Sequence, residues 1–133
     1  MPLTANKNKV MQTFTKAERL SSKAEIDRLF ESGKSFYSAP FKIIWKETSE
    51  STVPAKIVVS IPKRLFKRSV DRNRLKRLTR EVYRKNKHVL YENLENKKIV
   101  LIFIYTSKSI IEFKEMEEKI ITALQRLSSN INT

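Results

Sequence analysis

The chain contains no cysteine, one glycine, one histidine and half as many acidic as basic residues. Without cysteine it cannot form disulfides, thiolate-ligated zinc sites or a thiol nucleophile. Its only histidine, His88, cannot build a histidine-rich metal site, and we expect it to be a surface residue. These absences exclude much of the chemistry that protein enzymes use.

Long apolar segments are also missing. No run of about 18 apolar residues occurs, and residues 1–10 lack the apolar core of a signal peptide. We therefore expect a cytoplasmic protein without a membrane partner. At 133 residues the chain suits one core. We predict a mobile arm over residues 1–13, one domain over 14–128 and a short tail over 129–133.

The most prominent feature of the composition is its excess of basic residues. The chain has 28 Lys and Arg but only 14 Asp and Glu, which gives a net charge of +14. Between Lys63 and His88, twelve Lys or Arg residues accompany only two acidic ones. A solvated helix face usually mixes charge signs, whereas clustered like charge opposes folding unless a partner neutralises it. Since phosphate backbones release counterions when cations bind, the cluster favours a nucleic acid over a merely soluble surface.

Residues 69–84 show the spacing of one amphipathic helix. Its apolar side is expected to contain Val70, Leu75, Leu78 and Val82. Its cationic side is expected to contain Arg72, Lys76, Arg77, Arg80 and Arg84. Few of the apolar residues are large, which makes an anionic membrane the weaker interpretation.

The remaining pattern predicts the element order α-β-β-α-β-α and an α+β class. A first helix begins at a capping box on Ser22 and ends at Gly33, which we expect to adopt a left-handed conformation. Strands are predicted between residues 36 and 45 and over residues 56–61, paired as a hairpin. A buried central strand over residues 99–105 precedes a last helix, with Ser109 and Glu112 as its capping box. We expect a mixed sheet with helices on one side.

Residues 71–77, DRNRLKR, resemble the RNR motif of the protein component of bacterial ribonuclease P, and residues 14–20, FTKAERL, resemble that family's N-terminal region. The similarity extends from residue 14 to residue 127. It implies a single α-β-β-α-β-α domain with a left-handed crossover carrying the RNR helix. It further implies a protein that binds the ribonuclease P RNA and the 5′ leader of precursor tRNA.

The resemblance implies that a large RNA subunit cleaves precursor tRNA with magnesium, while the protein supplies no catalytic residue and needs no cofactor or small-molecule substrate. Contacts with the catalytic RNA are expected from Lys63, Arg64, Arg68, Arg72, Asn73, Arg74, Lys76, Arg77 and Arg80. Contacts with the leader are expected from Ile26, Phe30, Phe36, Tyr37, Phe41, Lys42, Ile44, Lys56 and Ser60. For the aromatic residues, ordinary core packing is the competing interpretation.

Two other functions stay open at this point. One is a ribosome-associated or general RNA-binding protein without a nuclease partner. The other is an autonomous metal-dependent nuclease, which would need paired carboxylates or a histidine base. Asp71 lies among arginines and is better interpreted as a helix cap, so we find no convincing catalytic site in the sequence.

Overall fold

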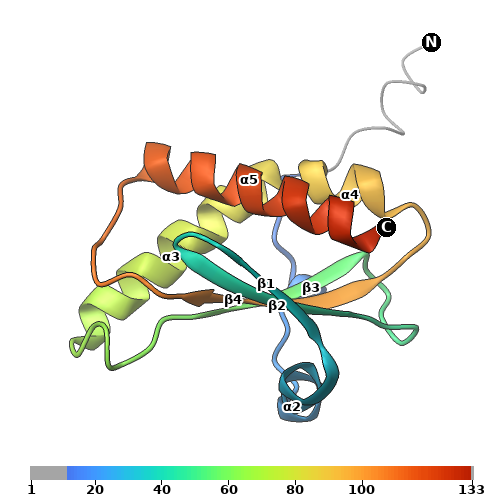
Figure 1. Cartoon of the computed structure of the whole chain (residues 1–133), viewed down its shortest axis with the longest axis horizontal. Coiled ribbons are helices and arrows are strands. Elements are labelled where there is room, and N and C mark those ends of the chain that lie inside the picture. The colour runs from blue at the N-terminus through green and yellow to red at the C-terminus, as the bar shows by residue number, and fades with distance from the viewer. Residues whose placement is uncertain (1–11, 133) are drawn as a thin grey trace.

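The computed structural model describes residues 12–132, so the predicted arm lies almost entirely outside the described residues. Figure 1 shows a sheet with helices on both sides. The helical elements are η1 (Lys16–Glu18), α2 (Lys23–Ser32), α3 (Ser69–Asn86), α4 (His88–Leu94) and α5 (Phe113–Ile131). The strands are β1 (Lys34–Ser38), β2 (Phe41–Glu47), β3 (Ala55–Ser60) and β4 (Ile99–Tyr105).

The four strands form a mixed sheet in the order β1-β2-β4-β3, which confirms the α+β class. Strands β3 and β4 are parallel, and the other two pairings are antiparallel. The predicted hairpin between β2 and β3 is wrong, because β4 lies between them. A strand as continuously apolar as β4 needs cover on both faces and therefore takes a central position. The single strand predicted between residues 36 and 45 is two strands, and the true hairpin joins β1 to β2 through Ala39 and Pro40.

The main core fills the face of the sheet beneath α3, α4 and α5 (Figure 1). Alternate side chains of each strand point to this face. Those from the two central strands are Phe41, Ile43, Trp45, Ile99, Leu101, Phe103 and Tyr105. Helix α5 continues to Ile131, which is buried. The predicted tail from residue 129 therefore begins inside this helix.

Helix α2 covers part of the opposite face, which corrects the expectation that helices lie on one side only. Leu29 packs there with Ile44 and Ile102 in a second, smaller cluster. Gly33 ends the helix with φ −73° and is not left-handed. An added Cβ at Gly33 would lie 2.6 Å from the Leu29 carbonyl oxygen and 2.7 Å from Cγ2 of Ile44. Glycine is thus required by the close approach of α2 to the sheet.

The ends of the helices agree with the sequence in part. The Oγ of Ser22 accepts the Glu25 amide, which confirms that half of the predicted capping box, whereas the Glu25 carboxylate lies 3.7 Å from Nζ of Lys56. The predicted box at Ser109 is wrong, since α5 begins only at Phe113, and the Ser109 carbonyl instead accepts the Tyr105 hydroxyl at 2.5 Å. Over residues 12–132, no helix is both long and apolar enough to cross a membrane.

Candidate nucleic-acid interface

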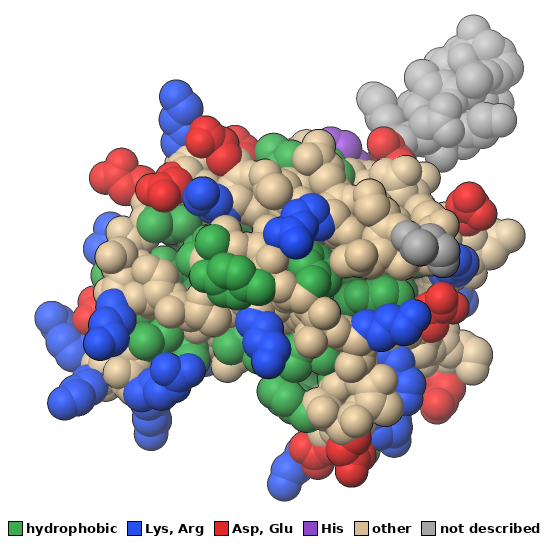
Figure 2. Space-filling view, in the orientation of Figure 1, with side chains coloured by type: hydrophobic (Ala, Val, Ile, Leu, Met, Phe, Trp, Pro, Cys, Tyr) green, Lys and Arg blue, Asp and Glu red, His purple; other side chains and the backbone are tan. Residues whose placement is uncertain are grey.

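Helix α3 runs from Ser69 to Asn86 and presents one side to the core and the other to solvent. Leu75, Val82 and Tyr83 are fully buried on the inner side, which confirms the predicted amphipathic helix. Val70 is an exception: it is 56% exposed, because the first turn lies at the end of the molecule beside the preceding loop. Figure 2 shows basic side chains gathered at that end. The packing of α3 thus keeps its cationic side exposed.

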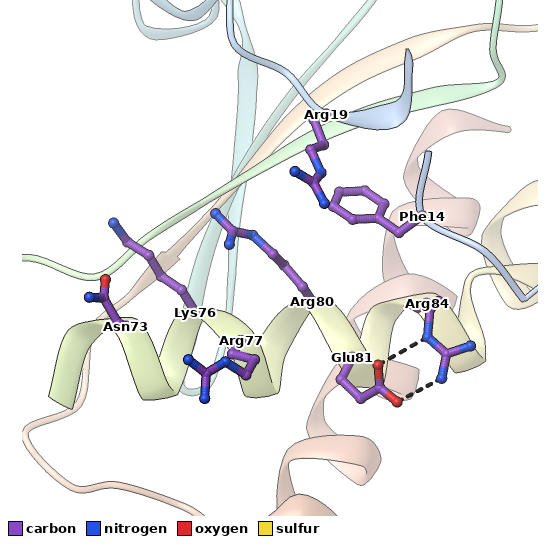
Figure 3. Close-up of a pocket in the computed structure, with 8 residues that line it drawn as sticks. All are labelled: Phe14, Arg19, Asn73, Lys76, Arg77, Arg80, Glu81 and Arg84. Carbon is purple, nitrogen blue, oxygen red and sulfur yellow. Dashed lines mark hydrogen bonds and ion pairs between the residues drawn. The ribbon is translucent and has the colours of Figure 1, made fainter. Parts of the chain in front are cut away.

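A groove of about 580 Å³ separates α3 from the segment over residues 14–19. Figure 3 shows Asn73, Lys76 and Arg80 projecting from the side of α3 on which Arg19 and Phe14 lie. The Arg19 guanidinium lies 5.4 Å from the centroid of the Phe14 ring. We call this space the polar groove. It combines cations from two chain segments with one aromatic ring, a combination suited to phosphates and bases.

A second groove of about 550 Å³ lies at the N-terminal end of α3, and we call it the N-terminal groove. Arg68 and Arg74 line it, and it shares Asn73 and Arg77 with the polar groove. The two grooves therefore meet at Asn73 and Arg77, on the exposed outer side of the helix, which we call the cationic crest. This arrangement brings most of the predicted RNA-binding residues onto one surface.

Two of the arginines on this helix are already engaged within the protein. Nη1 of Arg72 donates to the carbonyl oxygens of Phe66 and Lys67, both at 2.8 Å, and so fixes the loop before α3. Arg84 forms a two-pronged ion pair with Glu81 (Figure 3). The predicted contacts Lys63 and Arg64, in contrast, are exposed. Arg72 thus shapes the binding surface, and the exposed cations supply its charge.

A buried ion pair that the sequence analysis missed holds the far wall of the polar groove. Nζ of Lys87 lies 2.5 Å from Oε2 of Glu18, and both side chains are at most 5% exposed. Tyr91 donates its hydroxyl to the same oxygen. Oε1 of Glu18 accepts the Thr15 amide at 3.0 Å. The Thr-x-x-Glu spacing of residues 15–18 was the available signal, since it is typical of a capping box.

The charge of Glu18 is stabilised by these partners. Burial alone would raise the pKa of its carboxyl, but the hydrogen bonds from Lys87, Tyr91 and Thr15 outweigh burial and lower it. Burial also raises the pKa values of Tyr83 and Tyr91. The cluster therefore keeps a carboxylate charged inside the protein. It joins the residues around Phe14 to the junction of α3 and α4.

The second predicted surface lies on the α2 side of the sheet. There, one row of register partners crosses all four strands. The row consists of Tyr37, Lys42, Ile104 and Ser60. Partners in register point to the same face, and Phe30 projects from the neighbouring helix with 57% exposure. We call this row, together with Phe30, the sheet strip. Ile104 was missed by the sequence analysis.

The other predicted leader contacts do not lie on the sheet strip. Ile44 is 6% exposed beneath α2, and Ile26 packs on the same cluster. Lys56 lies 3.7 Å from the Glu25 carboxylate. These three residues attach α2 to the sheet.

Phe36 and Phe41 are on the opposite face, which is a correction. Phe41 has no exposed surface and packs edge-on against Phe103 and Tyr105. Phe36 pairs in register with Ile43, and the Arg126 guanidinium lies 5.3 Å from its ring centroid. Strand alternation places both rings beneath α5. Neither ring can stack on a nucleotide bound along the α2 side.

A sequence model of the family described as Ribonuclease P matches residues 14–128. The chain belongs to the ribonuclease P protein family. It is 36% identical over 120 residues to the ribonuclease P protein component of Porphyromonas gingivalis strain W83, covering 88% of each chain. It is 28% identical over 116 residues to that of Thermotoga maritima, covering 87% of this chain and 97% of the relative.

Solved structures of ribonuclease P proteins share this fold. The protein from Thermotoga maritima superposes with a TM-score of 0.68 at 24% identity, covering 82% of this chain and 96% of that structure. The protein from Staphylococcus aureus gives 0.66 at 22% identity, covering 84% and 96%. Both comparisons show the ribonuclease P protein fold that the RNR-like motif implied.

Proposed function

We propose that this protein is the subunit of ribonuclease P that binds the catalytic RNA through α3 and holds the 5′ leader of precursor tRNA on the sheet strip. The observation that carries the first part is the exposed cationic crest of α3, with a groove on each side of Arg77. Guanidinium groups form forked hydrogen bonds with phosphate oxygens. The structured RNA would contact the crest and the two grooves.

We assign the cleavage chemistry and the magnesium to the RNA partner. Residues 12–132 contain no group of three His, Cys, Asp or Glu side chains arranged to hold a metal ion. Asp71 lies 3.9 Å from the Arg68 guanidinium, and Glu81 is paired with Arg84. We therefore route no step of the reaction through a metal held by the described side chains. The protein acts by binding and positioning RNA.

The sheet strip suits a single strand of RNA. Phe30 and Tyr37 are each 57% exposed and offer ring surfaces for bases. Lys42, the register partner of Tyr37, is exposed and can neutralise a phosphate. Because the strip and α3 are linked by the loop after Ser60, one protein can contact both RNAs at once.

Reconstitution tests this function. The protein is mixed with a bacterial ribonuclease P RNA at a magnesium concentration too low for the RNA alone, and cleavage of a precursor tRNA is measured. We expect cleavage at the mature 5′ end with both components present and none with the protein alone. Cleavage by the protein alone would move the chemistry to the protein. No stimulation of an RNA that a known family member activates would reject the proposed function.

A further inference from the structure

A third groove, of about 450 Å³, lies on the side of α3 away from Phe14, between that helix and the start of α5. We call it the α3–α5 groove. Leu78, Ile110 and Phe113 supply apolar surface, and Arg74 and Arg77 form part of its rim. Ile110 is 42% exposed and Phe113 is 36% exposed. Exposed apolar side chains grouped beside a binding surface indicate an interaction site.

We propose that the α3–α5 groove receives one unpaired nucleobase of the RNA that binds α3; this inference rests on the proposed function. Arg77 lines all three grooves, and Arg74 lines both this one and the N-terminal groove. The apolar space is therefore continuous with the cationic surface. When the phosphate of a nucleotide contacts these two arginines, the base of that nucleotide is separated from the phosphate by one sugar. The base then lies at the mouth of the groove.

The charges around the groove favour a base over an apolar partner. Nζ of Lys85 lies 5.1 Å from the ring centroid of Phe113, which adds a third cation beside the apolar surface. Glu81 is neutralised by Arg84, which leaves Glu112 as the one other carboxylate on the lining against the three cations Arg74, Arg77 and Lys85. A purely apolar partner covering this site would remove water from Arg74 and Arg77 without pairing them. A nucleotide supplies both an apolar ring and the phosphate that pairs with the arginines.

The test uses the full-length protein and a ribonuclease P RNA that the wild-type protein activates. Phe113→Ala is expected to weaken RNA binding about fivefold or more, the loss that removing one stacking ring produces. Ile110→Ala is expected to weaken it about threefold, because the base loses apolar contact area but no stacking surface. The slope of log affinity against log salt should stay unchanged, because no phosphate contact is removed. Ile121→Ala is the matched control, since this residue lies on α5 and lines none of the three grooves.

A photoreactive phenylalanine analogue at position 113 then identifies the contacted nucleotide. We expect crosslinking to one unpaired nucleotide, and removal of its base should abolish the effect of Phe113→Ala. If Phe113→Ala lowers thermal stability, Ile110→Ala decides the matter, because this exposed residue precedes the helix. Wild-type affinity in the folded variants, or crosslinks only to a second protein chain, would overturn the inference. Since the wild-type protein activates the RNA throughout, neither result would affect the proposed function.

Discussion

The two faces of the sheet are closed to different degrees. Beneath α3, α4 and α5, rings such as Phe41, Phe103 and Tyr105 have no exposed surface at all. On the opposite face α2 and the preceding Leu20 pack against the strands, and Phe30 and Tyr37 remain more than half exposed. One face of the sheet is therefore fully covered by helices. On the other face the strands are covered over only part of their length.

This difference determines how each side can bind RNA. Where three helices cover the sheet, a partner meets helix surfaces and not the strands, and the exposed cations make α3 the helix suited to an anionic partner. On the α2 side the sheet itself is accessible, so bases can contact the strands and Phe30 directly. A large structured RNA suits the first surface, and a flexible single strand suits the second.

The largest expected effect is the difference in stability between alanine variants of two phenylalanines on opposite faces of the sheet. Phe41→Ala should lower the free energy of unfolding by about 3 to 5 kcal/mol, because it leaves a cavity among packed rings. Phe30→Ala should change it by about 0.5 kcal/mol or less, because that ring is largely in water. Urea unfolding of both variants measures the difference. Equal losses would mean that the α2 side is as tightly packed as the other.

The next effect concerns the buried ion pair that holds the segment around Phe14 near α3. Lys87→Met should cost about 3 kcal/mol, because it leaves the Glu18 carboxylate buried without its cation. This cost is at the low end of the range for breaking a buried ion pair, because the Tyr91 hydroxyl still donates a hydrogen bond to the Glu18 carboxylate. Thermal and urea unfolding measure it. The double variant Glu18→Gln with Lys87→Met should recover part of the loss, and a further loss would contradict this account.

The ion pair between Glu18 and Lys87 should also make the free energy of unfolding depend on pH. The folded-state pKa of Glu18 is below its ordinary value of 4.5, so its contribution to stability is complete above that pH and is lost as the pH falls through the lowered pKa. Unfolding free energies measured from pH 7 down to about pH 3 should fall more steeply in the wild type than in Glu18→Gln. Parallel curves would show that other carboxylates dominate acid unfolding.

The sequence predicted helices better than it predicted the sheet. The period of α3 placed Leu75 inward and Arg77 outward without further information, because a helix face is defined by residues within one segment. Strand alternation separated Phe41 from Lys42 correctly but could not say which face a helix would cover. Phe41 was assigned to the leader surface from the family resemblance, with core packing as the alternative, and the structure places it in the core. Pairing of β2 with β4 depends on residues more than 50 positions apart, and no local pattern reveals it.

The candidate site, like the fold, could be predicted from the sequence only in part. The exposed residues Lys63, Arg64 and Arg77 follow from charge alone, whereas the use of Arg72 to fix its own loop depends on the path of the chain at Phe66. Lys87 had been counted among the clustered cations, and only the fold shows that it is buried against Glu18. A cationic stretch thus identifies the surface but not which of its members are free.

Removing one cation from the α3 surface should weaken binding of the catalytic RNA whatever the leader. Arg77→Ala should lower the salt slope by about 0.7 to 0.9, the share of one phosphate contact. Its unfolding free energy should stay within about 0.5 kcal/mol of wild type, because the side chain is exposed. Arg28→Ala, an exposed arginine on α2, is the matched control. An equal slope change in both variants would mean that the net charge of the protein, and not a phosphate contact made by Arg77, determines the salt dependence.

The smallest effect should appear on the sheet strip and only with leader present. In the wild type, affinity for precursor tRNA should rise as leader nucleotides are added, whereas Tyr37→Ala should reduce that gain about fivefold by removing one stacking surface. Tyr37→Phe keeps the ring and loses only the weak 3.4 Å contact with Thr106, so it should preserve the gain. With mature tRNA all three proteins should bind alike. If Tyr37→Ala weakened both substrates equally, the open side of the sheet would not be the surface that recognises the leader, and the contrast between the two faces would concern packing alone.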